Sequence, residues 1–253
     1  MPRKQKTALI DGDIVVFRCS TVFDTPTEYF GNGLYQFDES SALENAKAMC
    51  NRIVEESGCY DGLICFSSRE NFRKDVLPSY KGNRVSRKPI QYTSIKEGLV
   101  KWSTMRTLEK PRLEGDDVIG ILATGKLKDQ CVICSIDKDL LTIPGFHLNF
   151  DDDFGSVVEV TPEEADRYFW SQVISGDRTD GYAGAPGFGP VKAGKFLDEC
   201  ESTDQSLWQA IVDGPYEGDS GLALTNARCA RILRHDEFDY HARKPILWSP
   251  ENA

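Results

Sequence analysis

Long apolar segments are missing from this sequence of 253 residues. The longest of them, such as residues 14–17, are far too short to cross a bilayer. The basic start Met-Pro-Arg-Lys-Gln-Lys is followed within a few residues by Asp11-Gly12-Asp13, so the hydrophobic region of a signal peptide does not form. We therefore expect a cytoplasmic protein that does not bind membranes.

Histidine is scarce, with three residues and no HExxH or similar spacing, which argues against zinc hydrolysis and histidine catalysis. Eight cysteines in a chain of this length do not form a disulfide scaffold, and we interpret them as reduced thiols. Cys131 and Cys134 have a suggestive spacing, but no second pair completes a zinc site. Two cysteines of a buried strand explain this pair best.

Positive charge is in the minority, since the sequence has 30 Lys and Arg residues and 40 Asp and Glu residues, and the net charge is −10. Residues 69–112 nevertheless hold 12 basic residues against 4 acids, a local charge of +8 that leaves −18 for the remainder. Four aromatic residues are interleaved with these cations: Phe72, Tyr80, Tyr92 and Trp102. This mixture suits a nucleic-acid backbone and stacked bases, although a solvated basic face is the alternative.

Apolar strands and amphipathic helices alternate along the chain. Strands are predicted at residues 7–10, 62–66 and 131–136, and helices at residues 42–57, 94–108, 113–127, 163–174 and from about Lys192. This order predicts an α/β fold with a mostly parallel central sheet flanked by helices.

Carboxylates recur at the ends of these elements. They are Asp11 and Asp13 after the first strand, Glu114, Asp116 and Asp117 at a helix start, Asp137 and Asp139 after the third strand, and Asp177 and Asp180 before a glycine-rich turn. Helix capping and turn formation explain any one group. Several groups at one sheet edge would repel one another unless cations were bound. Oxygen ligands without His or Cys favour two Mg²⁺ or Mn²⁺ ions, as in two-metal phosphodiester cleavage.

Two further segments suit phosphate binding. Gly184, Gly187 and Gly189 form a turn ahead of a helix that contains Lys192, where backbone amides and the helix N-terminus attract phosphate. A plain loop is the alternative. In the segment Tyr80-Lys81-Gly-Asn-Arg84, a ring could stack on a base and two cations could contact the scissile phosphate, unless they are ordinary surface charges.

Five motifs in order resemble the flap-endonuclease superfamily, which includes the 5′-nuclease domain of bacterial DNA polymerase I and the phage 5′→3′ exonucleases. They are LIDGD, LPSYKGNR, EGDDVIG, SIDKDLL and GDRTDGYAGAPGFG. Within this superfamily the chain is most similar to the exonucleases of short-tailed phages. The segments that favour this branch are Asp-Gly-Tyr, after the second Asp of the last motif, and the closing segments ARILR and ILWSP.

The resemblance implies a PIN-like 5′-nuclease core at residues 1–169, with a helical arch at about residues 81–110. Residues 170–253 would form the helix–two-turn–helix DNA-binding element, often accompanied by K⁺, and C-terminal helices. Asp11, Glu114, Asp116 and Asp137 match acids of the first metal, and Asp139, Asp177 and Asp180 those of the second. Asp117 belongs to the same acidic set without assignment to one ion. Lys81 and Arg84 match the catalytic basic pair at the base of the arch, with Tyr80 as a stacking residue.

One position departs from the pattern, because Ser68 fills the slot where the family usually has an Asp after the second strand. Asp13 is an extra acid that could compensate.

The resemblance implies a Mg²⁺-dependent 5′→3′ exonuclease that acts on double-stranded DNA with a 5′ end, nick or flap and leaves 5′-phosphate products. It would serve phage replication, primer removal or host DNA degradation in the infected bacterial cytoplasm. The alternatives are a DNA-binding module with weakened catalysis and a nuclease for RNA–DNA hybrids.

Overall fold

The computed structural model describes residues 6–22, 24–26, 35–83, 88–152, 155–200 and 204–251. Its centre is a six-stranded sheet with the order β5-β4-β1-β6-β7-β8. The strands are β1 (Thr7–Asp11), β4 (Asp61–Phe66), β5 (Arg106–Glu109), β6 (Cys131–Cys134), β7 (Gly145–Leu148) and β8 (Val158–Val160). All neighbours pair in parallel except β7 and β8, which are antiparallel, so the predicted mostly parallel sheet is confirmed.

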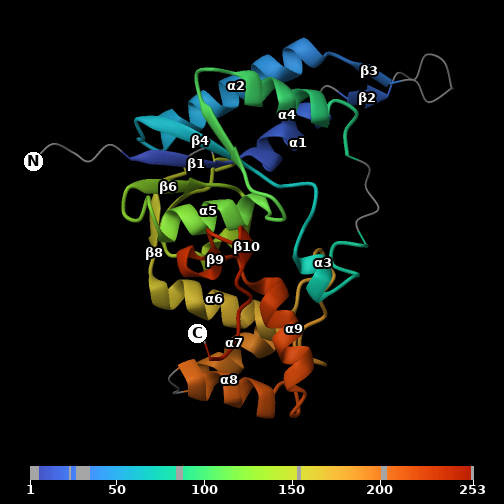
Figure 1. The fold of residues 1–253 in the computed structure, drawn as a ribbon, viewed down its shortest axis with the longest axis vertical. Coiled ribbons are helices and arrows are strands. Elements are labelled where there is room, and N and C mark those ends of the chain that lie inside the picture. The colour runs from blue at the N-terminus through green and yellow to red at the C-terminus, as the bar shows by residue number, and fades with distance from the viewer. Residues whose placement is uncertain are drawn as a thin grey trace, which may run out of the picture.

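Helices cover both faces of the sheet (Figure 1). One face carries α1 (Gly12–Val22), α2 (Glu39–Glu56) and α4 (Tyr92–Lys101), and the other carries α5 (Gly115–Thr124). Alternate residues of β1 explain this double cover, since Ala8 and Ile10 pack in the first layer and Leu9 in the second. A strand that is apolar on both sides is the expected pattern for a covered parallel sheet.

The C-terminal helices pack around a third apolar core beside the α5 face. They are α6 (Pro162–Ser175), α7 (Pro190–Glu199), α8 (Asp204–Asp213) and α9 (Ser220–Ala230). Phe169, Trp170 and Trp248 form the aromatic centre of this core, with ring centroids 4.8 to 6.0 Å apart. Tyr80 also belongs to this core, so the segment after the short helix α3 (Arg73–Val76) lies between the two helical regions.

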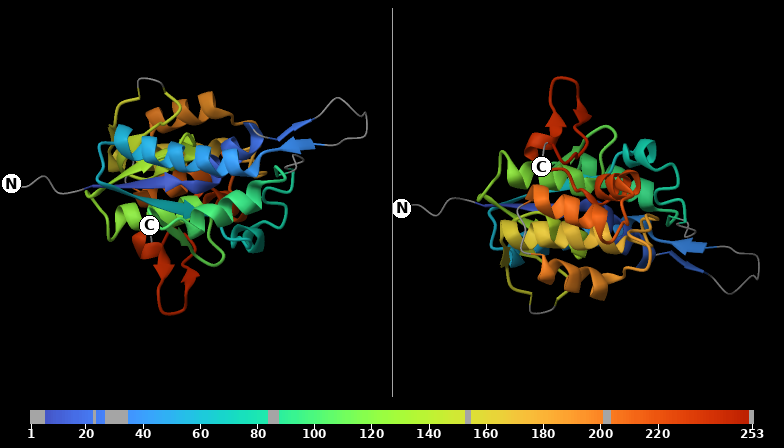
Figure 2. Two further views of the ribbon diagram at one scale, coloured as in Figure 1. Left: turned by 90° about the horizontal axis from the view of Figure 1, so that it is seen from above. Right: turned by 90° about the horizontal axis from the view of Figure 1, so that it is seen from below.

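Two 3₁₀ helices and two short strand pairs complete the described part of the chain. Residues Lys138–Thr142 and His235–Glu237 form the 3₁₀ helices η2 and η3. The strands β2 (Asp24–Pro26) and β3 (Tyr35–Phe37) form one antiparallel pair, and β9 (Phe238–Asp239) and β10 (Lys244–Pro245) form another. Figure 2 shows that both pairs project from the body of the molecule, in different directions.

The predicted helix 94–108 is wrong at its C-terminal end. It ends at Lys101, and residues Arg106–Glu109 form the edge strand β5 beside β4. The apolar side of α4, with Ile95 and Leu99, is buried against α1 and α2. The second half of the arch expected at residues 81–110 therefore belongs to the core, because this apolar face needs burial.

The cysteines behave as predicted, since all eight are free thiols. Cys131 and Cys134 are buried in β6, and burial raises the pKa of the Cys131 thiol to about 12. In the described part of the chain, no helix combines the length and apolar character needed to span a bilayer.

Candidate active site

The acids gather at the carboxyl edge of the sheet because β1 lies between β4 and β6. Asp11 is the last residue of β1, and Asp137 follows β6. Ser135 joins the two ends: its Oγ donates to Asp11 Oδ2 over 2.8 Å and accepts from the Asp137 amide over 3.0 Å. Asp116 enters this group from the first turn of α5.

Negative charge is poorly compensated in this first acidic group. Asp11 is 4% exposed, and burial, with Asp13 and Asp137 nearby, raises its pKa to about 7 despite the Ser135 hydrogen bond. Burial and the charges of Asp11, Asp137 and Glu114 raise the pKa of Asp116 well above its ordinary value. Carboxylates in this state favour a bound cation, which removes their mutual repulsion.

A second acidic group lines an adjacent pocket of about 320 Å³. Its carboxylates are Asp137, Asp139, Asp177 and Asp180. Asp139 Oδ1 accepts from Gln172 Nε2 on α6 over 2.6 Å. Burial, followed by repulsion from the other three acids, raises the pKa of Asp139 to about 7. The donor set is again all oxygen, which suits a hard divalent cation.

Lys81 lies between Glu114 and Asp180. Its Nζ forms an ion pair with Glu114 Oε1 and lies 3.5 Å from Asp180 Oδ2, while its backbone N–H donates to Asp180 O over 2.7 Å. Burial opposes ionisation of Glu114, but the charges of Lys81 and Arg73 lower its pKa to about 2. Lys81 is therefore held among the acids by ion pairs with two of them.

Tyr80 does not take the expected stacking role. The side chain is 2% exposed, and its hydroxyl donates to Asp180 Oδ2 over 2.7 Å and lies 3.1 Å from Glu114 Oε2. A ring packed in the C-terminal core has no face for a base. The prediction of base stacking is wrong because the phenol hydroxyl finds its partners among the buried acids.

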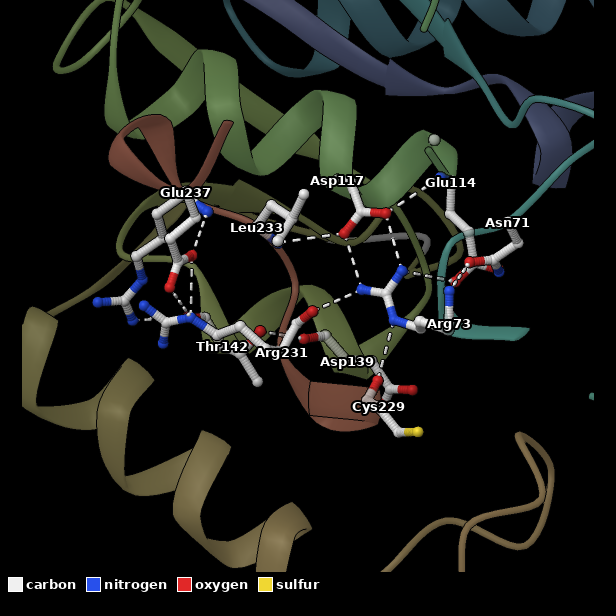
Figure 3. Close-up of polar contacts among 12 residues, drawn as sticks. Asn71, Arg73, Glu114, Asp117, Asp139, Thr142, Cys229, Arg231, Leu233 and Glu237 are labelled. Carbon is white, nitrogen blue, oxygen red and sulfur yellow. Dashed lines mark hydrogen bonds and ion pairs between the residues drawn. The ribbon is translucent and has the colours of Figure 1, made fainter. Parts of the chain in front are cut away.

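Asp117 was predicted to bind a metal ion, but its carboxylate is bonded to protein donors. It is fully buried, and its two oxygens accept from Arg73 Nη1 (2.8 Å), Arg73 Nη2 (2.7 Å), Leu233 N (3.1 Å) and Glu114 N (3.0 Å), as Figure 3 shows. Four protein donors occupy this carboxylate, so its role is structural.

Sequence reasoning missed Arg73. It is 2% exposed and reaches Glu114, Asp117 and the carbonyl oxygens of Cys229 and Arg231. Within the basic segment 69–112 no local feature separates Arg73 from the cations that face solvent.

Asp13 and the second strand meet through Ser67 rather than Ser68. Asp13 accepts from the Ser67 amide over 2.8 Å and from the Tyr92 hydroxyl over 2.6 Å, while Ser67 Oγ accepts from Gly115 N over 2.9 Å. The Ser68 amide donates to Leu113 O over 2.9 Å. The position facing Asp13 and the N-terminus of α5 is therefore residue 67.

The glycine-rich turn follows the second acidic group directly. Gly184 has φ +70°, and a Cβ there would lie 2.3 Å from Gly176 N, so the close approach of the two backbones requires glycine. Gly187 and Gly189 are exposed ahead of α7, and Lys192 Nζ donates to Gly187 O over 2.8 Å. This geometry leaves an exposed helix N-terminus beside a lysine.

Arg84 lies outside the described residues. Among the described residues, no group of three or more His, Cys, Asp or Glu side chains is closed tightly enough to hold one ion. The acids form two neighbouring groups, several of them held by protein donors, and their donor chemistry fits divalent ions.

Residues 6–166 match the family described as "5′-3′ exonuclease, N-terminal resolvase-like domain". The exodeoxyribonuclease of Enterobacteria phage T3 is 30% identical over 223 residues, covering 75% of this chain and 74% of that protein. The exonuclease of Escherichia phage T7 is 29% identical over 224 residues, covering 74% and 73%.

Solved structures share the fold. A 5′-exonuclease of phage T5 with bound divalent zinc ions has a TM-score of 0.69 at 16% identity, covering 89% of each chain. A T5 flap endonuclease in a pseudo-enzyme–product complex with DNA and metal ions has a TM-score of 0.58 at 16% identity, covering 89% of this chain and 91% of that one.

Proposed function

The chain belongs to the 5′-3′ exonuclease family, and from this premise we propose that it is a divalent-metal-dependent exodeoxyribonuclease. It hydrolyses DNA phosphodiesters from 5′ ends and leaves 5′-phosphate products. The observation that supports this most directly is the convergence of Asp11, Asp116 and Asp137 at one sheet edge with raised pKa values for the first two. Acids so placed need cations, and cations there suit phosphodiester chemistry.

The proposed ions are two Mg²⁺ or Mn²⁺. Asp11, Glu114, Asp116 and Asp137 would hold the first, and Asp139, Asp177 and Asp180 the second, with Asp117 kept as their support. The divalent zinc ions of the T5 5′-exonuclease and the metal ions of the T5 flap endonuclease support a metal site in this fold. Ions held by these residues would supply an activated water and would neutralise charge on the phosphate.

The protein's own cations act beside these acids. Lys81 is held within reach of both groups, so its ammonium offsets the charge that develops on the scissile phosphate. Arg84 is proposed as its partner at the base of the arch. Since the apolar side of α4 and the strand β5 pack against the core, we propose that the arch does not extend beyond the start of α4.

DNA binding is assigned to the C-terminal region. We assign residues 1–169 to the nuclease core and 170–253 to a helix–two-turn–helix region. The turn with Gly184, Gly187 and Gly189 and the start of α7 would hold the phosphates of duplex DNA, with Lys192 adding charge and K⁺ bound at the carbonyls. The preferred substrate is double-stranded DNA with a 5′ end, nick or flap, in agreement with the DNA complex of the T5 relative. RNA–DNA hybrids are the alternative substrate.

The setting follows from the phage relatives. We place the enzyme in the cytoplasm of an infected bacterium, where it removes primers or degrades host DNA.

A duplex labelled at one 5′ end, incubated with Mg²⁺ or with EDTA and followed over time on a gel, tests the proposal. The expected result is early release of labelled mono- or short oligonucleotides with Mg²⁺ alone. An intact duplex that shifts on a native gel at every Mg²⁺ and Mn²⁺ concentration would instead identify a DNA-binding module. An RNA–DNA hybrid run in parallel measures the preference between the two substrates.

A further inference from the structure

Arg73 uses its whole guanidinium in the interior of the protein. Nε donates to Cys229 O over 3.0 Å, Nη1 to Asp117 and Glu114 over 2.8 and 3.2 Å, and Nη2 to Asp117 and Arg231 O over 2.7 and 2.5 Å. A cation that is 2% exposed is costly to bury unless its donors are satisfied, and here they are. Asp117 holds the pKa of Arg73 above its ordinary value against the effect of burial.

These bonds join three separate parts of the chain (Figure 3). Arg73 begins α3, which leads to Lys81, and its acidic partners lie at the N-terminus of α5. The two carbonyls belong to the C-terminal end of α9, where Cys229 lies in the last turn and Arg231 directly follows the helix. One side chain therefore fixes the relative position of the basic segment, the acidic helix start and the C-terminal segment.

Glu114 is the point at which this arrangement meets the site. Its Oε2 faces Arg73 Nη1 and the Tyr80 hydroxyl, and its Oε1 faces Lys81 Nζ. The carboxylate is 14% exposed and has one oxygen held from behind by the buried guanidinium. The opposite oxygen is thereby directed toward Lys81.

We propose that Arg73 is a positioning residue for the cleavage reaction, which rests on the function proposed above. It sets the orientation of the Glu114 carboxylate, and through it the place of Lys81, while making no contact with substrate. Asp117 fixes the orientation of the Arg73 guanidinium plane because it accepts hydrogen bonds from both terminal nitrogens. A lysine cannot reproduce this planar fork, although it retains the charge.

The test compares the replacement of arginine by lysine at two positions. Arg73→Lys is expected to lower kcat about 10- to 100-fold, the usual effect of removing a group that orients a metal ligand. KM, and the Kd for DNA in EDTA, should stay within about twofold of wild type. Arg234→Lys is the control, because Arg234 is a partly enclosed arginine, 20% exposed, whose side chain bonds Thr142 O and Asp166 rather than a catalytic acid. Its kcat should remain near the wild-type value at a similar loss of stability.

A double-mutant cycle tests the route of the effect. If Arg73 acts through Glu114, Arg73→Lys costs kcat much less in a Glu114→Gln background than in the wild type. Asp117→Asn, which leaves Arg73 in place without its orienting charge, should give the same signature and serves if Arg73→Lys does not fold.

Three results would overturn the proposal. They are a wild-type kcat for both Arg73→Lys and Asp117→Asn, an equal loss of kcat in Arg234→Lys, and full additivity with Glu114→Gln. A wild-type protein that does not cut DNA would overturn the proposed function instead, so the two failures are distinct.

Discussion

Ser135 Oγ lies 2.8 Å from Asp11 Oδ2 and connects the ends of β1 and β6 at the centre of the acidic group. The hydroxyl donates to one acid and accepts from the amide of Asp137, so it fixes two proposed ligands at once. The hydrogen bond also lowers the pKa of Asp11, against the larger effect of burial.

Ser135→Ala should raise the Mg²⁺ concentration for half-maximal cutting by about 10-fold or more, because ligands that lose an orienting partner bind metal less tightly. A Mg²⁺ titration of the initial rate measures this. Ser20→Ala is the matched control, a fully buried serine that bonds Val16 O in α1, and its Mg²⁺ requirement should not change. An unchanged requirement in Ser135→Ala would remove Ser135 from the support of the site.

Asp137→Ala should lower kcat by about a thousandfold or more, since metal-bound charge stabilisation is worth several kcal/mol. DNA affinity in EDTA should stay close to that of wild type, because the proposed duplex contacts lie in the C-terminal region. Single-turnover rates and fluorescence anisotropy give the two quantities. Asp151→Asn serves as control, an exposed acid paired with Arg18 outside the cluster. Cutting at the wild-type rate by Asp137→Ala would contradict the metal assignment.

Asp117→Asn should reduce the free energy of unfolding by about 3–5 kcal/mol, since it leaves the buried charge of Arg73 without its partner. Urea denaturation in EDTA measures the loss without a metal contribution. Glu56→Gln, which removes an exposed ion pair with Arg52, should cost no more than about 1 kcal/mol. Equal losses of the free energy of unfolding in both variants would show that the pairing of Asp117 with Arg73 does not stabilise the fold.

Ser67→Asp should lower the Mg²⁺ concentration needed for cutting, because a carboxylate at this position adds charge beside Asp13 and α5. Ser68→Asp, one residue further along, is the comparison and should behave like wild type. The sequence pointed to Ser68, so the reverse outcome would restore that first interpretation.

His147 should make stability fall in acid. It is 6% exposed, with Nε2 2.8 Å from Ile143 O, and burial lowers its pKa below the ordinary 6.5. A depressed folded-state pKa means that the unfolded chain binds the proton first, so this contribution is complete above about pH 6.5 and is lost as the pH falls through the folded value. The free energy of unfolding of wild type should drop relative to His147→Gln by up to about 1.4 kcal/mol per pH unit. Denaturation curves recorded between pH 7 and pH 5 measure this difference. If the free energies of unfolding of the two proteins changed in parallel with pH, His147 would be excluded as the cause.

The sequence by itself determined the mostly parallel sheet and most of the acids. Continuous apolar strands such as Cys131–Cys134 can only be buried on both faces, and acids that follow parallel strands must meet at one edge. Asp11 and Asp137 could be predicted for that reason. The order of the five motifs then predicted the family, because five short motifs in a fixed order are far more specific than any single one.

Only the tertiary structure separated neighbours with similar chemistry. Asp116 and Asp117 are consecutive on α5, but a helix turns about 100° per residue, so one faces the acidic group and the other faces Arg73. The burial of Tyr80 and Arg73 depends on residues 100 and 158 positions away, Asp180 and Arg231, and no local pattern encodes such contacts. The strand β5 was missed for the same reason, since Arg106–Glu109 is a strand through its pairing with β4.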